Sequence, residues 1–99
     1  MGKQTPHCKL AVVHAMIHAG KVRATVTATT TALAVGVVGT QEMCDIILSL
    51  TTRDFHKSMT THADHKVWQD VYHCEYNGIS LYIKLTVVDD LLIVSFKEL

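Results

Sequence analysis

The chain has 99 residues, of which 48% are hydrophobic and 18% are charged, and this size allows one compact domain over residues 1–99. The length excludes two-domain enzymes and repeat arrays. Nine basic residues balance nine acidic ones, so the chain lacks the overall basicity that would by itself suggest a nucleic-acid partner. The low net charge also argues against intrinsic disorder. The charge is unevenly distributed, because residues 1–41 carry four basic and no acidic side chains, whereas residues 42–99 carry five basic and nine acidic ones.

The apolar runs are too short to span a bilayer, since the longest, residues 32–38, is interrupted by Gly36. No positively charged start leads into a signal-peptide core, so we expect a cytoplasmic protein without a membrane partner. The three cysteines are an odd number without a close pair, which predicts reduced, partly buried thiols rather than a disulfide framework or a cysteine-rich zinc site. They are Cys8, Cys44 and Cys74.

The first predicted element is a helix. Thr5 and Pro6 are typical of an N-cap and a first-turn proline, apolar residues follow at helical spacing, and Gly20 ends the pattern. Residues 22–27 are β-branched and favour a short strand. The next segment, residues 28–39, is a low-complexity run of Thr, Ala, Val and Gly that fits either a mobile connection or a short helix.

Two further helices are predicted before the pattern changes. Thr40 is suited to cap a helix over residues 41–50, where apolar side chains recur at helical spacing and acidic ones lie near the positive end of the helix dipole. Thr52 is suited to cap a third, short helix over residues 53–59.

The C-terminal part is predicted to be a sheet. Residues 67–76 and 79–88 alternate and are rich in β-branched and aromatic side chains, and the turn signal Asn77-Gly78 joins them as a hairpin. A further apolar run, residues 91–96, suits a strand that is buried on both sides. Helices followed by strands predict an α+β fold, with N-terminal helices packed on an antiparallel sheet.

The hairpin turn also predicts the register of its two strands. With Asn77 and Gly78 in the turn, the cross-strand pairs are 76/79, 73/82, 71/84 and 69/86. One face of the hairpin then carries polar and titratable side chains: Gln69, Val71, His73, Tyr82, Lys84 and Thr86. Apart from Asp70, the other face is apolar and suited to the core: Trp68, Tyr72, Cys74, Leu81, Ile83, Leu85 and Val87.

The polar face and the predicted third helix together hold cations, an amide and a phenol, contributed by Lys57, Gln69, His73, Tyr82 and Lys84. Such a set suits a phosphodiester, because cations stabilise developing negative charge and Lys, His or Tyr can transfer a proton. RNA supplies its own nucleophile, the 2′-OH, so no metal or other cofactor is required. The alternative is that these side chains are only solvated on an open sheet face.

The seven histidines raise the question of a metal site. His14 and His18 are spaced to meet on one helix face, and His62 and His65 bracket Asp64. Helix spacing alone supplies only two ligands, and no acidic residue in the first helix completes the set. We therefore expect solvated or RNA-facing histidines and no bound metal.

Several segments resemble a known family. They include Lys-Ser-Met-Thr at residues 57–60 and Trp-Gln-Asp-Val-Tyr at residues 68–72, and the similarity extends over nearly the whole chain. The family is that of the MqsR motility quorum-sensing regulators, which are toxins of the RelE-like group. The resemblance implies a bacterial type II toxin, a small α+β endoribonuclease that cleaves messenger RNA at GC-containing trinucleotides and is neutralised by a cognate, MqsA-like antitoxin protein.

The family's catalytic lysine, glutamine and tyrosine correspond to Lys57, Gln69 and Tyr82 in this sequence. The chain departs from the family pattern at His56 and His62, where the family has tyrosines, and over residues 24–40 and 73–76. A different class of function is also open, namely a non-catalytic regulatory module that binds protein or DNA through its basic N-terminal half.

Overall fold

The computed structural model describes residues 2–99 as a single α+β domain, which confirms the predicted class. Its six strands form one sheet in the order β1-β3-β4-β5-β6-β2, and all neighbouring strands are antiparallel except β2 and β6, which are parallel. In chain order the elements are β1 (Gly2–Lys3), α1 (Leu10–His18), β2 (Val22–Ala24), α2 (Val26–Ala34), α3 (Gly39–Leu48), the single 3-10 turn η1 (Thr52–Asp54), β3 (Phe55–Thr60), β4 (Trp68–Tyr76), β5 (Ile79–Val88) and β6 (Asp90–Glu98).

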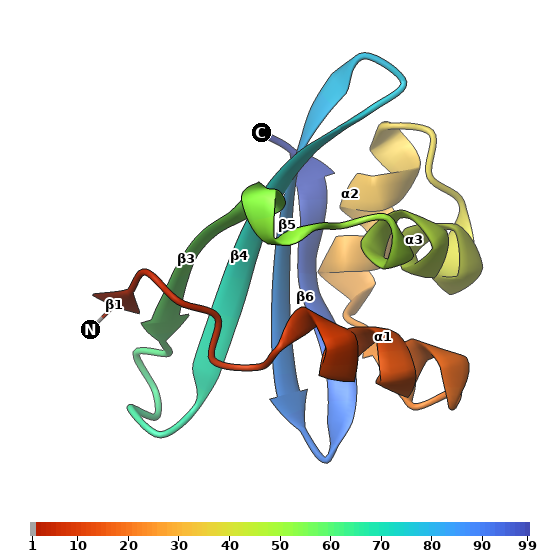
Figure 1. Ribbon diagram of the computed structural model, residues 1–99. Coiled ribbons are helices and arrows are strands. Elements are labelled where there is room, and N and C mark those ends of the chain that lie inside the picture. Colours follow the sequence, from red (N-terminus) through yellow and green to blue (C-terminus); the bar gives the residue numbers. More distant parts are fainter. Residues whose placement is uncertain (1) are drawn as a thin grey trace.

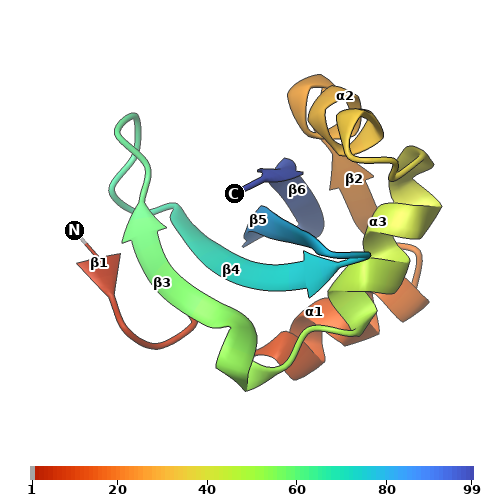
Figure 2. The same cartoon turned by 90° about the horizontal axis from the view of Figure 1, so that it is seen from above.

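The molecule has two layers, because the three helices lie against one face of a curved sheet (Figure 1). Viewed from above, β3 and β4 bend around the open side of the sheet, and none of the three helices covers that side (Figure 2). We call the two sides the covered face and the open face.

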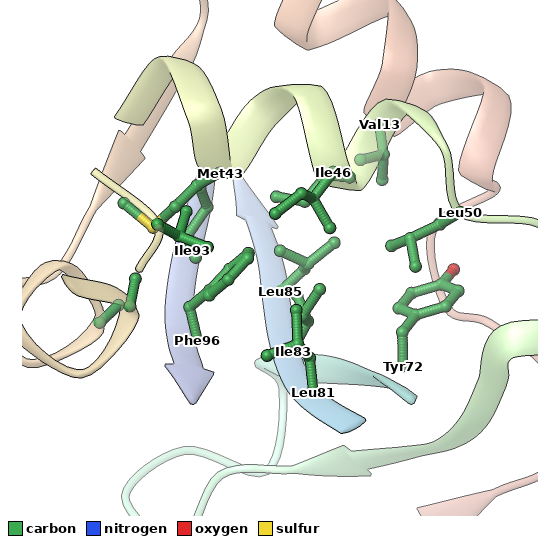
Figure 3. Close-up of a cluster of buried hydrophobic side chains, with 14 of the residues drawn as sticks. Val13, Met43, Ile46, Leu50, Tyr72, Leu81, Ile83, Leu85, Ile93 and Phe96 are labelled. Atoms are coloured by element: carbon green, nitrogen blue, oxygen red, sulfur yellow. The ribbon is translucent and has the colours of Figure 1, made fainter. Parts of the chain in front are cut away.

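The core lies between the covered face and the helices (Figure 3). Alternate residues of the central strands point into it, as the period of two in a strand requires. The side chains of α1 and α3 pack against them from the opposite layer, with Val13, Met43, Ile46 and Ile47 buried. The strands contribute Tyr72, Leu81, Ile83, Leu85, Leu91, Ile93 and Phe96.

The first helix begins later than its sequence predicts. The helix α1 starts at Leu10, and Thr5 and Pro6 lie outside it. The backbone N–H groups of His7 and Cys8 donate to the two carboxylate oxygens of Asp70, at 2.9 and 3.0 Å, and this holds the preceding segment against the sheet in a non-helical conformation. The predicted end is confirmed, because Gly20 has φ of 74° directly after the last turn.

Residues 28–34 of the low-complexity segment lie in α2, whereas residues 35–38 connect it to α3. Thr25 caps α2, since its hydroxyl accepts a hydrogen bond from the N–H of Ala28 at 3.0 Å. Thr31 attaches the helix to the sheet by donating to the carbonyl of Phe96 at 2.6 Å. The strand predicted over residues 22–27 is shorter, because β2 ends at Ala24 where α2 is about to begin.

The helix predicted over residues 41–50 begins two residues earlier, and Thr40 is not its cap. The N-cap of α3 is Val38, whose N–H donates to the carboxylate of Glu42 at 3.2 Å, so an acidic side chain within the first turn replaces the missing cap.

The prediction of a helix over residues 53–59 is wrong. Only the turn η1 is helical, closed by a capping box between Thr51 and Asp54, and the chain then enters β3 at Phe55. Pairing of β3 with β4, together with a 2.6 Å hydrogen bond from Ser58 to the buried Asp70, stabilises the extended form. Tertiary pairing therefore outweighs the local helical signal.

The β4–β5 hairpin has the predicted turn and register. Asn77 and Gly78 both have positive φ, and the pairs 76/79, 73/82 and 71/84 are present. The ladder ends at Asp70 and Leu85, one pair before the predicted 69/86. The last strand is only partly as predicted, because Leu91, Ile93 and Phe96 are buried whereas the residues between them are half-buried.

Among the described residues, no single helix is long and apolar enough to cross a membrane, although α2 and α3 together, bent by 80°, satisfy the length and composition test. The three cysteines are free, and burial raises the pKa of each thiol, to about 11 for Cys74. Their thiolate forms are therefore disfavoured.

Candidate active site

Four strands place a cluster of cationic and aromatic side chains on the open face. Directly paired residues of neighbouring strands share a face, so the register defines which side chains lie in a row. The first row crosses β3 to β6 as Lys57, Val71, Lys84 and Ser95. The second row crosses β4 to β6 as His73, Tyr82 and Lys97. Neither row contains a carboxylate.

A β-bulge in β3 adds His56 to the second row. Phe55 pairs with Tyr72 and Lys57 with Val71, so His56 is the extra residue between them. Its ring stacks on His73 with centroids 4.1 Å apart and planes inclined by 19°. The bulge therefore gives the open face both an imidazole and the ammonium group of Lys57 from adjacent positions.

A second bulge, in β6, brings Lys97 onto the same face. Leu85 pairs with Ile93 but Lys84 pairs with Ser95, which leaves Val94 as the extra residue. Without this shift, Phe96 would oppose Tyr82 on the open face, and Lys97 would point toward the core. With it, the ammonium of Lys97 lies 5.1 Å from the centroid of the Tyr82 ring.

The side chains of the cluster change one another's ionisation. Burial lowers the pKa of Lys84, and the neighbouring ammonium groups of Lys97 and Lys57 lower it further. Burial, His56 and Lys57 lower the pKa of His73, whereas burial raises that of Tyr82. The open face is therefore a crowded cationic surface, and a bound anion would relieve the repulsion.

All three residues singled out in the sequence lie on or beside this surface. Lys57 is in the first row and Tyr82 in the second, but Lys57 comes from a strand and not from the predicted helix. Gln69 precedes Val71 by two residues on β4, pairs with Met59, and is half-buried. Gln69 and His73 are four residues apart along β4, or about 13 Å, so Gln69 lies at the opposite end of the site from Tyr82.

The sequence did not identify His56 or Lys97 as part of this surface. Alternation predicts which residues share a face only where the register is constant, and it fails at a bulge. His56 occupies the bulge in β3, and Lys97 follows the bulge in β6. A two-residue turn at Asp89 and Asp90 without a bulge would also pair Tyr82 with Lys97, so extending the register across β6 could have found Lys97. In the structure Val88 pairs with Asp90, and the bulge at Val94 restores that pairing.

The other histidines do not converge on a common point. His14 lies with its Nε2 3.0 Å from the carbonyl of Ile47, and His7 stacks on Trp68 with centroids 5.4 Å apart. His62 and His65 are exposed in the loop between β3 and β4. Within residues 2–99, no group of three His, Cys, Asp or Glu side chains is arranged to hold a metal ion.

Comparison with known proteins agrees with this picture. Residues 5–98 match the family model described as the motility quorum-sensing regulator, toxin of MqsA. The chain is 46% identical over 98 residues to the mRNA interferase toxin MqsR of Escherichia coli (strain K12), and the alignment covers 99% of both chains. The chain therefore belongs to this family of toxins.

Proposed function

From membership of this family and from the cationic open face, we propose that the chain is the toxin of a type II toxin–antitoxin system and an endoribonuclease that cleaves messenger RNA. The curated relative is named as an mRNA interferase. We further propose that the enzyme acts in the cytoplasm, where its substrate is found, and that an MqsA-like antitoxin protein neutralises it.

The observation that carries the proposal is the clustering of Lys57, Lys84 and Lys97 on a face that no helix covers. Three ammonium groups attract a polyanion, and the shallow, curved surface is accessible to a single strand. The exposed ring of His56 next to them offers a surface on which a base can stack.

The chemistry follows from these side chains. The 2′-OH of the RNA attacks the adjacent phosphorus, and the products are a 2′,3′-cyclic phosphate and a 5′-hydroxyl. Lys57 stabilises the charge that develops on the phosphorane, Tyr82 contacts the phosphate as a donor, and Gln69 orients the strand beside it. Because the nucleophile is part of the substrate, we expect cleavage to continue when divalent cations are chelated.

The test is incubation of the purified chain with single-stranded RNA in EDTA, with and without GC-containing trinucleotides. We expect cuts at defined positions that end in a cyclic phosphate, and cleavage slower by about 10²–10³ for Lys57→Ala. Intact RNA would contradict the proposal and favour a binding module. Loss of cleavage in EDTA with recovery on adding zinc or magnesium would contradict the metal-free mechanism.

The toxin role is tested in cells. Expression of this chain alone should arrest bacterial growth, and co-expression of an MqsA-like protein should restore it. Growth equal to that of an empty-vector strain, with soluble and folded protein present, would contradict the proposal.

A further inference from the structure

His73 and Tyr82 form an imidazole–phenol pair in the second row of the open face. They are direct cross-strand partners on β4 and β5, both half-buried, with ring centroids 5.7 Å apart and planes inclined by 42°. We propose that His73 is the general base and Tyr82 the general acid of the RNA cleavage, an assignment that rests on the function proposed above.

The geometry allows both groups to reach one phosphodiester. A group that transfers a proton must approach the reacting oxygen to about 2.6–3.2 Å. Two rings separated by 5.7 Å on adjacent strands can therefore contact the two oxygens on opposite sides of one phosphorus. Lys57 lies in the neighbouring row, from which it reaches the non-bridging oxygens.

The environments of the two groups favour opposite protonation states. Burial, His56 and Lys57 lower the pKa of His73 from its usual 6.5, so its imidazole is neutral at pH 7 and able to accept a proton. Burial raises the pKa of Tyr82 above 10, so its hydroxyl keeps its proton and can donate it. Two titratable neighbours displaced in opposite directions are the pattern expected of a base and an acid.

The proposed step is balanced in atoms and protons. A ring nitrogen of His73 takes the proton of the 2′-OH as the O2′–P bond forms. The P–O5′ bond breaks, and Tyr82 transfers its proton to the departing O5′. The products are the 2′,3′-cyclic phosphate and a 5′-hydroxyl, with His73 protonated and Tyr82 ionised until water restores them.

The charges around His73 come from every neighbouring element. His56 and Lys57 face it from β3, Tyr82 and Lys84 from β5, and Lys97 from β6 beyond them. Two acidic residues, Asp54 and Glu75, share with His73 the rim of a hollow at the η1 end of the sheet. Since His56 stacks on the His73 ring and contributes to its lowered pKa, we treat His56 as a positioning residue.

The first experiment compares pH–rate profiles of His73→Gln and the unchanged chain. The acidic limb of the unchanged chain should lie below the usual imidazole pKa of 6.5, because the pKa of His73 is lowered. His73→Gln should be slower by about 10²–10⁴ and lack this acidic limb. His18→Gln, an exposed histidine on the helical layer, is the matched control and should behave as the unchanged chain. Thermal melting of each variant confirms that it is folded.

The second experiment separates the base from the acid. In RNA with sulfur in place of the bridging O5′, the leaving thiolate needs no proton. This substrate should restore the rate of Tyr82→Phe but not that of His73→Gln. Rescue of His73→Gln alone would reverse the assignment and contradict the proposal.

A third variant tests the role of His56. His56→Phe keeps a ring that can stack on His73 but removes the neighbouring charge, so the pKa of His73 should rise and the acidic limb should move to higher pH. An unmoved limb would contradict this role. If the unchanged chain leaves RNA intact, the proposed function fails; if it cleaves RNA and His73→Gln does so equally well, only the assignment to His73 fails.

Discussion

The covered and open faces of the sheet are built from alternate residues of the same strands, yet they differ in almost every physical property. On β5, Leu81, Ile83 and Leu85 are buried in the core, whereas Tyr82 and Lys84 between them are half-buried and polar. The covered face gains free energy from removing apolar surface from water, and the open face concentrates positive charge at some cost to stability. Stability and chemistry are therefore separable by single substitutions.

The largest separation is expected for Lys57→Ala. Removing one group that stabilises transition-state charge lowers rates by about 10²–10³, while the free energy of unfolding changes little because the side chain is only half-buried. RNA cleavage rates and urea unfolding of the same preparation measure both quantities. A large loss of stability in Lys57→Ala would show that stability and chemistry are not independent at this residue.

The opposite outcome is expected for Asp70→Ala on the covered face. The Asp70 carboxylate accepts hydrogen bonds from the N–H groups of His7 and Cys8 and from the hydroxyl of Ser58. Its removal leaves three donors without their partner, and we expect the free energy of unfolding to fall by about 3 kcal/mol. Below the melting temperature, cleavage per folded molecule should be retained. Denaturant melts matched to rate measurements provide the check.

Substitutions at two adjacent residues of β5 should have smaller effects and can be compared directly. Ile83→Val removes one buried methylene and should lower the free energy of unfolding by about 1 kcal/mol without changing the cleavage rate. Lys84→Met keeps the length of the side chain and removes its charge, so RNA binding should weaken with little effect on stability. Equal effects of the two changes on KM would argue against the division between faces.

The smallest effect concerns Tyr72, the covered-face counterpart of Tyr82. Its hydroxyl is buried without a hydrogen-bond partner among the described residues, and burial, Asp70 and Cys8 raise its pKa to about 12. Tyr72→Phe removes a polar group that makes no bond, so stability should stay within about 0.5 kcal/mol or rise. Cleavage should be unaffected, in contrast to Tyr82→Phe. A destabilised Tyr72→Phe would point to a partner such as ordered water.

The sheet was the part of the fold that the sequence predicted best. Period-two alternation and Asn77-Gly78 define both strands and their pairing, because these signals are local. The errors lie where residues distant in the sequence determine the local structure. The predicted N-cap at Thr5 was wrong because Asp70, more than 60 residues away, binds the backbone of His7 and Cys8. The predicted helix over residues 53–59 was wrong because residues 55–60 pair with β4 as a strand.

The site was predictable only in part for the same reason. Gln69 and Tyr82 share the hairpin's polar face by alternation alone, whereas Lys57 was included from a predicted helix that is strand β3 in the structure. The position of His56 depends on the bulge in β3, which is set by packing across strands and leaves no periodic signal. Lys97 was missed because the register was not extended from the hairpin to β6. Asp70 appeared as an exception on an apolar face, and that exception marked the residue that anchors the N-terminal segment.

The position of β6 in the sheet has a consequence for synthesis of the chain. β6 lies between β5 and β2, receives α2 on its covered face, and carries Lys97 on its open face. Val22 pairs with Leu91, a separation of nearly 70 residues, so β2 cannot join the sheet until the last strand is available. During synthesis, β2 therefore has no partner strand, and the cationic surface lacks Lys97, until residues 90–98 have left the ribosome.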